Sequence, residues 1–418
     1  MIGPLIVVAG FSLIGAAAAR LLGGGPRFLL GVGTTGFALH VALLLRIPML
    51  PAMIALALGA ALVLIFVQRR VDAAEPVPRS ALATVITVTP ILFLLVAAAI
   101  VPLRDYDGRA FWVLKAKAIA AERTIDGQFF QAERGPNPKN EYPLLVPISA
   151  AAVMVASGTS DDIAIRWLYV LALGSFALYA RRWVGVWPAA LIAWLPQFAV
   201  APEGGALSGY NDIFLAAFAA AAFFELVQKR SPLRFGVWLS FLVLTKNEGL
   251  PFALLLLVMA VVVWRRQIAA ALLPFSAAVV TLFVWRARVE PTDDDPLIRL
   301  LPTLPDRMER LLPAATALVE HAFDVKRWGL FWIAVAAAAV MLAVHRRWLT
   351  LAPAVVVIGG MSAVYIAAYM VTTWQLEDHV AASADRLIMH LVGPAVYLLG
   401  ALQREAPSAQ RREPVDRS

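Results

Sequence analysis

Long runs of apolar residues, separated by short polar turns, dominate the hydropathy pattern of this chain. A helix needs about 20 apolar residues to cross a bilayer, at ~1.5 Å per residue. The runs therefore predict an all-α, polytopic membrane protein with about 13 transmembrane helices. The run 235–244 is short, so its helix is expected to include flanking residues on both sides. The predicted spans are residues 2–22, 27–47, 48–67, 81–102, 162–180, 184–200, 209–227, 235–244, 250–264, 267–285, 328–344, 348–372 and 385–402.

Basic turns between these runs predict the orientation, because Lys and Arg collect in cytoplasmic loops. Two cytoplasmic basic turns must be joined by an even number of crossings, and the spans 81–102 and 162–180 already supply two between residues 70 and 181. Residues 142–156 therefore cannot cross fully, and we interpret them as a re-entrant or interfacial helix on the outer side. The chain then begins outside, ends inside and lies in a bacterial inner membrane. The basic segments predicted to be cytoplasmic are residues 69–70 together with 79, 181–182, 229–230 together with 234, 265–266, 346–347 and the C-terminal tail.

This threading divides the chain into six segments. Residues 1–102 are N-terminal transmembrane helices, 103–161 an outer catalytic loop with interfacial and re-entrant helices, and 162–287 a central transmembrane module. Residues 288–327 form an outer loop, 328–402 the C-terminal transmembrane helices, and 403–418 a cytoplasmic tail. Only six of the 28 acidic residues fall on the cytoplasmic side. A functional outer face and the solubility of long outer loops both explain that sorting.

Composition supports a membrane protein and changes little else. Hydrophobic residues make up 61% and charged residues 15% of the 418 positions, against roughly 45–50% and about 25% in soluble domains. The net charge of +8 reflects basic loops and not nucleic-acid binding, since no basic patch interleaved with aromatic residues lies outside the spans. The chain has no cysteine, which excludes disulfides and thiolate metal sites. The abundance of Ala, Arg and Leu favours a bacterial source.

The first polar stretch on the predicted outer face is "RDYDGRAFWVLKAKAIAAE", residues 104–122. Its apolar positions recur at helical spacing, which predicts an interfacial amphipathic helix with Trp112 at headgroup depth and Lys115 and Lys117 in water. Asp105 and Asp107 directly precede this helix. Asp107 is a candidate catalytic acid, and a helix N-cap is the alternative interpretation.

Two further stretches belong to the same face. "NEYPLLVP", residues 140–147, opens the re-entrant segment and is either a substrate contact or a simple Pro-bounded turn. "EGGALSGYNDIFLA", residues 203–216, brings Asn211 and Asp212 to the start of a span after glycines that allow close approach. Helix capping by Asn211 or Asp212 is the alternative here.

The remaining candidates lie at the mouths of later spans. "LTKNEGLPF", residues 244–252, places Lys246 and Glu248 between two apolar runs, where ionisable groups are costly and indicate function. A self-satisfied surface pair is the alternative. "TTWQLEDHVAASADRLIMHLVGP", residues 372–394, contributes His379 and puts Arg386 and His390 four residues apart on one helix face. Arg386 suits a phosphate, or else anchors the helix by snorkelling.

Carboxylates, a lysine and an arginine at lipid depth favour a lipid-borne phosphate substrate. A carboxylate can act as general base toward an acceptor hydroxyl. The cations can neutralise a lipid-phosphate leaving group as its charge develops.

At these residues the sequence resembles the GT-C superfamily of polyprenyl-phosphate-sugar-dependent glycosyltransferases. The likeness is greatest to the bacterial branch related to protein O-mannosyltransferases and aminoarabinose transferases. That branch carries "WDAWxxWxLKAKAL", "YPLLVP", "GYAD", "TKNEGL" and "TSADRLxxHxxP". This chain reads "YDGRAFWVLKAKAI", "YPLLVP", "GYND", "LTKNEGL" and "SADRLIMHLVGP" in the same order, over residues 105–394.

The resemblance implies roles for single residues. Asp107 matches the first-loop acid and is the expected base of an inverting transfer. Asp212 and Glu248 match acids that hold the acceptor or a metal, and Glu248 is also the carboxylate neighbour of Lys246 and Arg386. Lys246 and Arg386 match positions near the donor phosphate.

The chain departs from the family pattern in the first string. Tyr106 and Arg109 stand where the family has tryptophans, and only Trp112 matches. The alignment of Asp107 is weaker for that reason, and Asp105 is the second candidate for the base. Three predicted spans precede the one that leads into the catalytic loop, and the family pattern gives them no role.

The resulting hypothesis is a membrane glycosyltransferase that moves a sugar from a polyprenyl-phosphate donor to a lipid, glycan or protein acceptor outside the membrane. A transporter or lipid flippase is one alternative, but we see no internal repeat. A polysaccharide polymerase or ligase is another. Asp107, Asp212, Glu248 and His379 could ligate a divalent metal ion, although no spacing fixes one. Lys115, Lys117 and His390 are further site candidates.

Overall fold

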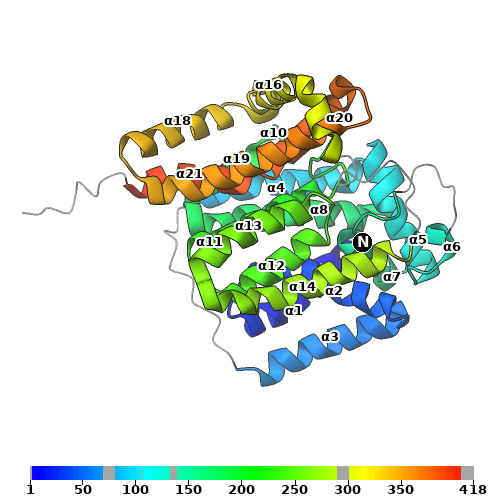
Figure 1. Ribbon diagram of the computed structural model, residues 1–418. Coiled ribbons are helices and arrows are strands. Elements are labelled where there is room, and N and C mark those ends of the chain that lie inside the picture. The colour runs from blue at the N-terminus through cyan, green and yellow to red at the C-terminus, as the bar shows by residue number, and fades with distance from the viewer. Residues whose placement is uncertain (1, 69–80, 104, 132–138, 290–300, 406–418) are drawn as a thin grey trace, which may run out of the picture.

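The computed structural model describes residues 2–68, 81–103, 105–131, 139–289 and 301–405, and within these ranges every regular element is a helix (Figure 1). The all-α class is therefore confirmed, and several apolar helices make this a multi-pass membrane protein. The predicted tail beyond 405, the basic loop 69–80 and part of the 288–327 loop lie outside the described residues.

The N-terminal helices form one side of the bundle. Helices α1 (Ile2–Leu22) and α2 (Arg27–Leu44) pack closely, and α3 (Met49–Phe66) lies at the edge beside them (Figure 1). A Cβ at Gly15 would collide with the backbone of Arg27, so a glycine is required where α1 crosses α2. Helix α4 (Ala81–Ile100) leaves this group and packs against α8 (Asp162–Val184) and α9 (Val186–Trp194).

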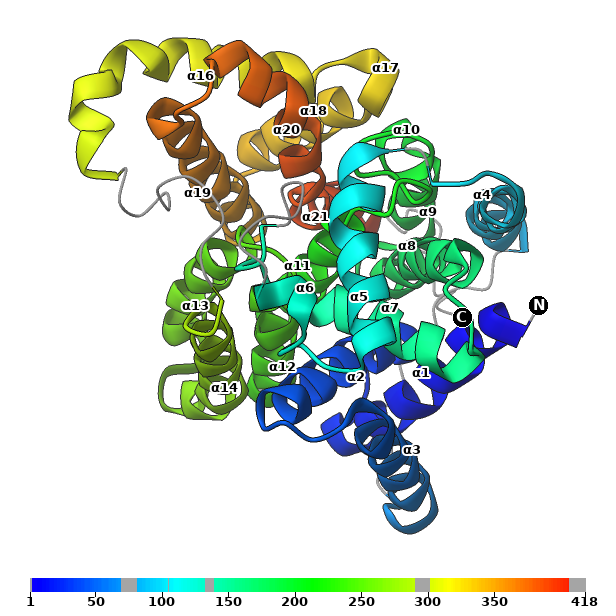
Figure 2. The same cartoon turned by 90° about the vertical axis from the view of Figure 1, so that its right-hand side faces the viewer.

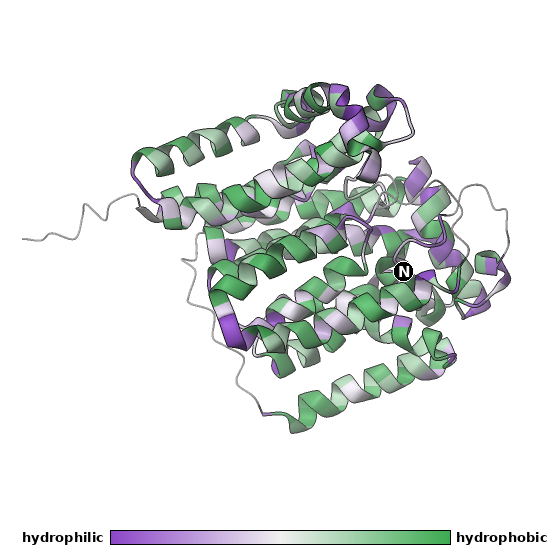
Figure 3. Ribbon diagram, viewed as in Figure 1, coloured by the Kyte–Doolittle hydropathy of each residue, from purple (hydrophilic) through white to green (hydrophobic). Residues whose placement is uncertain are grey.

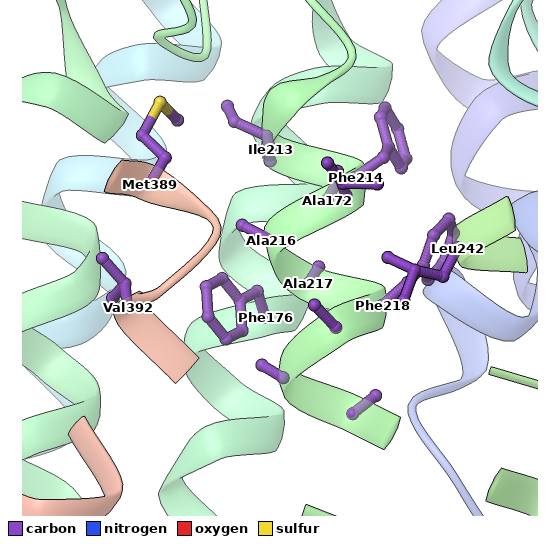
Figure 4. Close-up of a cluster of buried hydrophobic side chains, with 14 of the residues drawn as sticks. Ala172, Phe176, Ile213, Phe214, Ala216, Ala217, Phe218, Leu242, Met389 and Val392 are labelled. Atoms are coloured by element: carbon purple, nitrogen blue, oxygen red, sulfur yellow. The ribbon is translucent and has the colours of Figure 1, made fainter. Parts of the chain in front are cut away.

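The middle of the bundle is built around α11 (Asp212–Val227), in which nearly every residue is buried. Such all-round burial explains why the helix carries Phe and Ala on every face. Figure 4 shows Phe214 and Phe218 of α11 among side chains of neighbouring helices, with Phe176 and Leu242 close by. Because α11 is held on all sides, its first residue, Asp212, has a fixed position at the bundle end. The other central helices are α10 (Pro196–Ala199), α12 (Pro232–Val243), α13 (Gly249–Trp264), the 3-10 turn η2 (Arg265–Ile268) and α14 (Ala269–Arg286).

The C-terminal helices cover the opposite side of α11. They are the 3-10 segment η3 (Leu301–Arg310), α16 (Leu311–Ala322), α17 (Val325–Trp328), α18 (Phe331–Val344), α19 (Trp348–Val371), α20 (Leu376–Met389) and α21 (Val392–Glu405). Helix α21 packs against α8, α11, α18 and α19, which places the C-terminal part against the central helices.

Every predicted span contains helix, but the helices differ in length. Seven helical segments in the described ranges are long and apolar enough to cross a membrane, or eight if one bent pair is a single span. Helix α12 has 12 residues, about 18 Å, which is short of a ~30 Å hydrocarbon core. One of the seven segments contains both α13 and α14 (Figures 1 and 2). Arg265, at φ 48 and ψ −116, separates these two helices. The number of 13 crossings stays a prediction.

The predicted span 385–402 is not one continuous helix. Helix α20 begins at Leu376, and the chain bends by 44° between α20 and α21 at His390 and Leu391. The apolar pattern runs through this break, so it predicted one helix. The bend is accompanied by buried hydrogen bonds of the His390 side chain.

The loop after α4 also differs from its prediction. Its helix is a π-turn, η1 (Gly108–Val113), that continues into α5 (Leu114–Glu122), followed by the short α6 (Gln128–Gln131). Trp112 and Lys115 are buried in protein, so the expectation of a tryptophan at headgroup depth and a lysine in water is wrong for these two residues. Lys115 donates to the carbonyl of Lys139 at 2.6 Å and lies 4.0 Å from the Phe111 ring centroid, and these contacts compensate its burial.

Helix α7 (Leu145–Ser157) replaces the predicted re-entrant or interfacial segment. Ten of its 13 residues are buried, packed against α1, α2, α5 and α8. A helix covered by protein in this way does not lie on the surface, so the interfacial interpretation is wrong. The re-entrant interpretation stays a prediction.

The bundle has two distinct ends. Helices α5, α6 and α20 lie at the right-hand end in Figure 1, and the α18–α19 connection, with the basic pair 346–347, lies at the left. Figure 3 shows hydrophilic residues gathered at the right-hand end, while the helices between the ends are mostly hydrophobic. Figure 2 looks onto this end and shows α5 lying across it. The polar stretches predicted to share one face thus share one end of the bundle.

Candidate functional site

Four segments that are distant in sequence meet at the polar end of the bundle. The first residue of α11 brings Asp212, and the turn between α12 and α13 brings Lys246 and Glu248. The last turn of α20 brings Arg386, and the start of η1 brings Asp107. Five predicted site residues therefore lie in one region, which has a buried part and an exposed part.

The buried part is an ion-pair network centred on Asp212, which we call the inner network: Asp212, Lys246, Glu248 and His390. Asp212 Oδ1 accepts from Lys246 Nζ at 2.8 Å and lies 3.0 Å from His390 Nε2. Lys246 Nζ is also 3.3 Å from Glu248 Oε1. The side chains of Asp212 and His390 have no exposed area, and Lys246 has 5%. These charges pair with one another, although Glu248 is 28% exposed and, among the described residues, Asp212 Oδ2 and Glu248 Oε2 have no hydrogen-bond partner.

The geometry defines the proton positions on His390. Ionised Asp212 can only accept a hydrogen bond, so His390 donates from Nε2. In the neutral imidazole Nδ1 then accepts, and its partner is the Tyr365 hydroxyl of α19 at 3.1 Å. The imidazole therefore joins α11 to α19 at the point where α20 gives way to α21.

The more exposed part is the pair Asp107 and Arg386, which we call the mouth pair, although the Arg386 side chain is only 14% exposed. Arg386 Nη1 lies 3.5 Å from Asp107 Oδ2, and the guanidinium carbon is 4.9 Å from the Tyr210 ring centroid. Arg386 also donates to the Ala382 carbonyl. The Asp107 side chain is 43% exposed, so its carboxylate is open to an incoming group.

The helix-cap interpretations are wrong for the candidate acids. Asp107 and Asn211 stand at N-cap positions, but neither side chain accepts a capping hydrogen bond. Asp212 is the first residue of α11 and directs its carboxylate to Lys246 and His390. The self-pair interpretation of Lys246 and Glu248 is incomplete, because Lys246 is closer to Asp212.

Asp105, the second candidate for the base, lies at the start of the helical turn. Its backbone carbonyl accepts from the Arg109 amide at 3.0 Å and so begins the helical turn. Burial raises the pKa of the Asp105 carboxyl, partly offset by a backbone hydrogen bond. Asp107, and not Asp105, is the acid that pairs with Arg386.

Two glycines bring the first loop onto the helix ends. A Cβ at Gly108 would collide with the carbonyl of Ser208, and Gly209 has φ +81, a conformation that favours glycine. Residues 208 and 209 therefore lie directly against η1. This contact places Asp107 beside Arg386, which also stacks on Tyr210 from the same segment.

The other predicted candidates lie outside these two groups. His379 is hydrogen-bonded to the Thr372 hydroxyl at 2.8 Å. Lys117 pairs with Asp162 at 2.8 Å, and Lys115 is enclosed by aromatic rings. His390, only a secondary candidate from sequence, is an integral member of the inner network.

The expected metal ligands do not converge. Within the described residues no group of three His, Asp or Glu side chains is arranged to hold a metal ion. Between Asp212 and Glu248 the position that a cation would take is filled by Lys246 Nζ. Asp107, Asp212, Glu248 and His379, for which the sequence left metal binding open, do not form such a group.

Sequence reasoning missed several residues around the site. Burial raises the pKa of the Glu203 carboxyl, and the nearby charges of Arg386 and Arg327 oppose that shift. Glu203 opens the 203–216 string, so a signal for it was present. Tyr365 lies in an apolar run and gave no signal. Lys139 precedes the 140–147 string and was not considered.

Comparison with known proteins adds no relative. No family model, curated protein or solved structure matches this chain.

Proposed function

We propose that the protein is a glycosyltransferase that moves a sugar from a polyprenyl-phosphate donor to an acceptor at the polar end of the bundle. The observation that carries the proposal is the mouth pair: an accessible carboxylate beside an arginine, at the end of a membrane bundle. General-base catalysis needs the first, and a phosphate leaving group needs the second. The order of the GT-C-like strings supports the same conclusion.

The proposed step uses Asp107 as base. The acceptor hydroxyl gives its proton to the Asp107 carboxylate, and its oxygen forms a bond to the anomeric carbon of the sugar. The bond between that carbon and the phosphate oxygen breaks, and its electron pair stays on the polyprenyl phosphate. Arg386 neutralises the charge that develops there, and the configuration at the anomeric carbon inverts.

The inner network holds Arg386 in position beside Asp107. Asp212 starts a helix that is buried on all sides, and His390 follows Arg386 by one helical turn. The hydrogen bond between His390 and Asp212 fixes the end of α20 relative to α11. Arg386 is thereby held beside Asp107.

The assay is release of polyprenyl phosphate from lipid-phosphate-linked sugars by the purified protein in lipid nanodiscs. We expect wild-type protein to release it from at least one hexosyl or pentosyl donor. Asp107→Asn should lower the rate about 10²–10⁴-fold, since it removes a general base but keeps the side-chain size. Asp105→Asn is the matched control and should retain far more activity. Full activity of Asp107→Asn would exclude this mechanism.

We further propose 13 crossings in the bacterial inner membrane, with the polar end outside. The basic turns at the opposite end support this orientation. The chain has no cysteine, so single cysteines at Gln128 and His345 can be labelled without background. An impermeant thiol reagent should label Gln128→Cys in intact cells (after outer-membrane permeabilisation, if one is present) but not His345→Cys. The opposite pattern would reverse the orientation.

A further inference from the structure

The lipid phosphate needs more positive charge than the mouth pair provides. Asp107 already neutralises most of the charge of Arg386. Lys246, the second cation expected from sequence, is almost fully buried between Asp212 and Glu248. With His390 neutral, this network carries one net negative charge, so it repels a phosphate.

Lys139 is a second cation at the same end of the bundle. Its Nζ lies 5.9 Å from the ring centroids of both Tyr142 and Trp374. Among the residues that the structure describes, no carboxylate forms an ion pair with it. Lys139 adopts φ 38, and its carbonyl is held by Lys115 Nζ, so the backbone at this position is anchored from the protein interior.

Trp374 connects Lys139 to the mouth pair. The Trp374 ring is 5.6 Å from the ring of His379, which lies two helical turns before Arg386 on α20. The Tyr142 ring is 5.3 Å from the ring of Phe111, four residues after Asp107. Lys139 and Arg386 therefore border one region, between the α19–α20 turn and the first loop. Trp374 is 48% exposed, so this region is open.

We propose that Lys139 and Arg386 together bind the phosphate of the lipid donor, above a floor formed by Tyr142 and Trp374. This inference rests on the proposed function and names the residues that hold its donor. Arg386 offers a planar guanidinium, whose Nη1 now faces Asp107 and whose Nε and Nη2 donate to the Ala382 carbonyl, so a phosphate would take the place of these partners. Lys139 offers a mobile point charge. Lys246 is a positioning residue that holds Asp212 and Glu248.

The charge that develops in the reaction favours two cations at the leaving group. A polyprenyl phosphate monoester carries one to two negative charges. The donor is a phosphodiester with one charge, and the leaving phosphate gains more as the bond breaks. Two cations at the leaving group therefore bind the transition state and the product more strongly than the donor.

The test is direct binding of a short-chain polyprenyl phosphate to full-length protein in nanodiscs. Lys139→Met and Arg386→Met should each weaken binding about tenfold or more, because each loses a charge-assisted hydrogen bond. Lys326→Met removes an exposed lysine of the same end and should bind like wild type. Thermal unfolding shows whether each variant is folded.

Two ligands identify what is bound. The corresponding polyprenol, which lacks the phosphate, should bind weakly and equally to wild type and Lys139→Met. Inorganic phosphate should compete only at much higher concentration, and equal competition would mean that the site takes free phosphate and not a lipid. Arg386→Lys should also bind weakly, since a point charge cannot reproduce the fork.

Unchanged affinity in Lys139→Met would overturn the proposal. So would weakened binding in a folded Lys246→Met variant with normal binding in Lys139→Met, which would return the phosphate to Lys246. The glycosyltransferase proposal fails separately, if polyprenyl phosphate binds as described but no lipid-linked sugar is turned over.

Discussion

The inner network and the mouth pair contain the same kinds of charged groups in opposite environments. In the inner network, Lys246 Nζ is 2.8 Å from Asp212 and almost fully buried. In the mouth pair, Arg386 is 3.5 Å from an Asp107 side chain that is 43% exposed. Buried charges are costly unless they are paired, whereas a loose and accessible pair can exchange its partner. The inner network is thus expected to govern stability, and the mouth pair to govern chemistry.

The largest effect on folding is expected from Lys246→Met. The substitution leaves two carboxylates without their cation, and breaking a buried ion pair in this way costs about 3–5 kcal/mol. Thermal or chemical unfolding of the solubilised protein measures it. The double variant Lys246→Met with Asp212→Asn should recover part of the loss, because it removes one uncompensated charge. Equal stability of Lys246→Met and wild type would contradict the division into two regions.

A smaller loss is expected when the hydrogen bonds of His390 are removed. His390→Ala removes one of the two donors to Asp212 and the acceptor of the Tyr365 hydroxyl, which costs about 1–3 kcal/mol. Tyr365→Phe loses one hydrogen bond and should cost less. His390→Gln retains an amide donor and should restore more transfer activity than His390→Ala at equal substrate concentration. A purely space-filling role would give both His390 variants the same activity per folded molecule.

The smallest effect concerns His321 and Asp385, a partly exposed pair next to Arg386. The hydrogen bond that His321 Nδ1 donates to Asp385 Oδ1, 3.2 Å away, raises the pKa of His321 above its ordinary 6.5. The folded protein therefore binds this proton more tightly than the unfolded chain does. The resulting stability is present below about pH 6.5 and is lost as the pH rises through the folded-state pKa. The contribution should stay below about 1 kcal/mol, because solvent screens the pair.

Unfolding of wild type and His321→Gln between pH 5 and 9 measures this contribution. The difference in stability between the two proteins should shrink as the pH rises. A difference that is constant over this range would show that the protonated form of His321 does not stabilise the fold.

Much of the fold could be predicted from the hydropathy pattern alone. Apolar runs of membrane length have no other way to satisfy their backbone groups in lipid, so each became helical, including α1 at its predicted bounds. The bend at His390 could not be predicted, because it accompanies contacts with residues 178 and 25 positions away. Lys115 escaped prediction for a similar reason, since its aromatic surroundings come partly from Tyr142.

The residues of the site could be predicted from the sequence, but their division into a buried network and an accessible pair could not. Asp107, Asp212, Lys246, Glu248 and Arg386 were all identified as charges that an apolar chain retains for a reason. Sequence cannot show that Lys246 is enclosed by two carboxylates while Arg386 faces an exposed one. That difference in burial is set by tertiary packing around α11. It separates positioning residues from residues available to a substrate.

The most direct test of this account is a structure of the protein in nanodiscs with a short-chain polyprenyl phosphate. The account predicts phosphate density within hydrogen-bond distance, about 2.7–3.2 Å, of Arg386 and Lys139 and beside Asp107. Lys246 should remain paired with Asp212 and Glu248. Phosphate density on Lys246, or at the opposite end of the bundle, would contradict it.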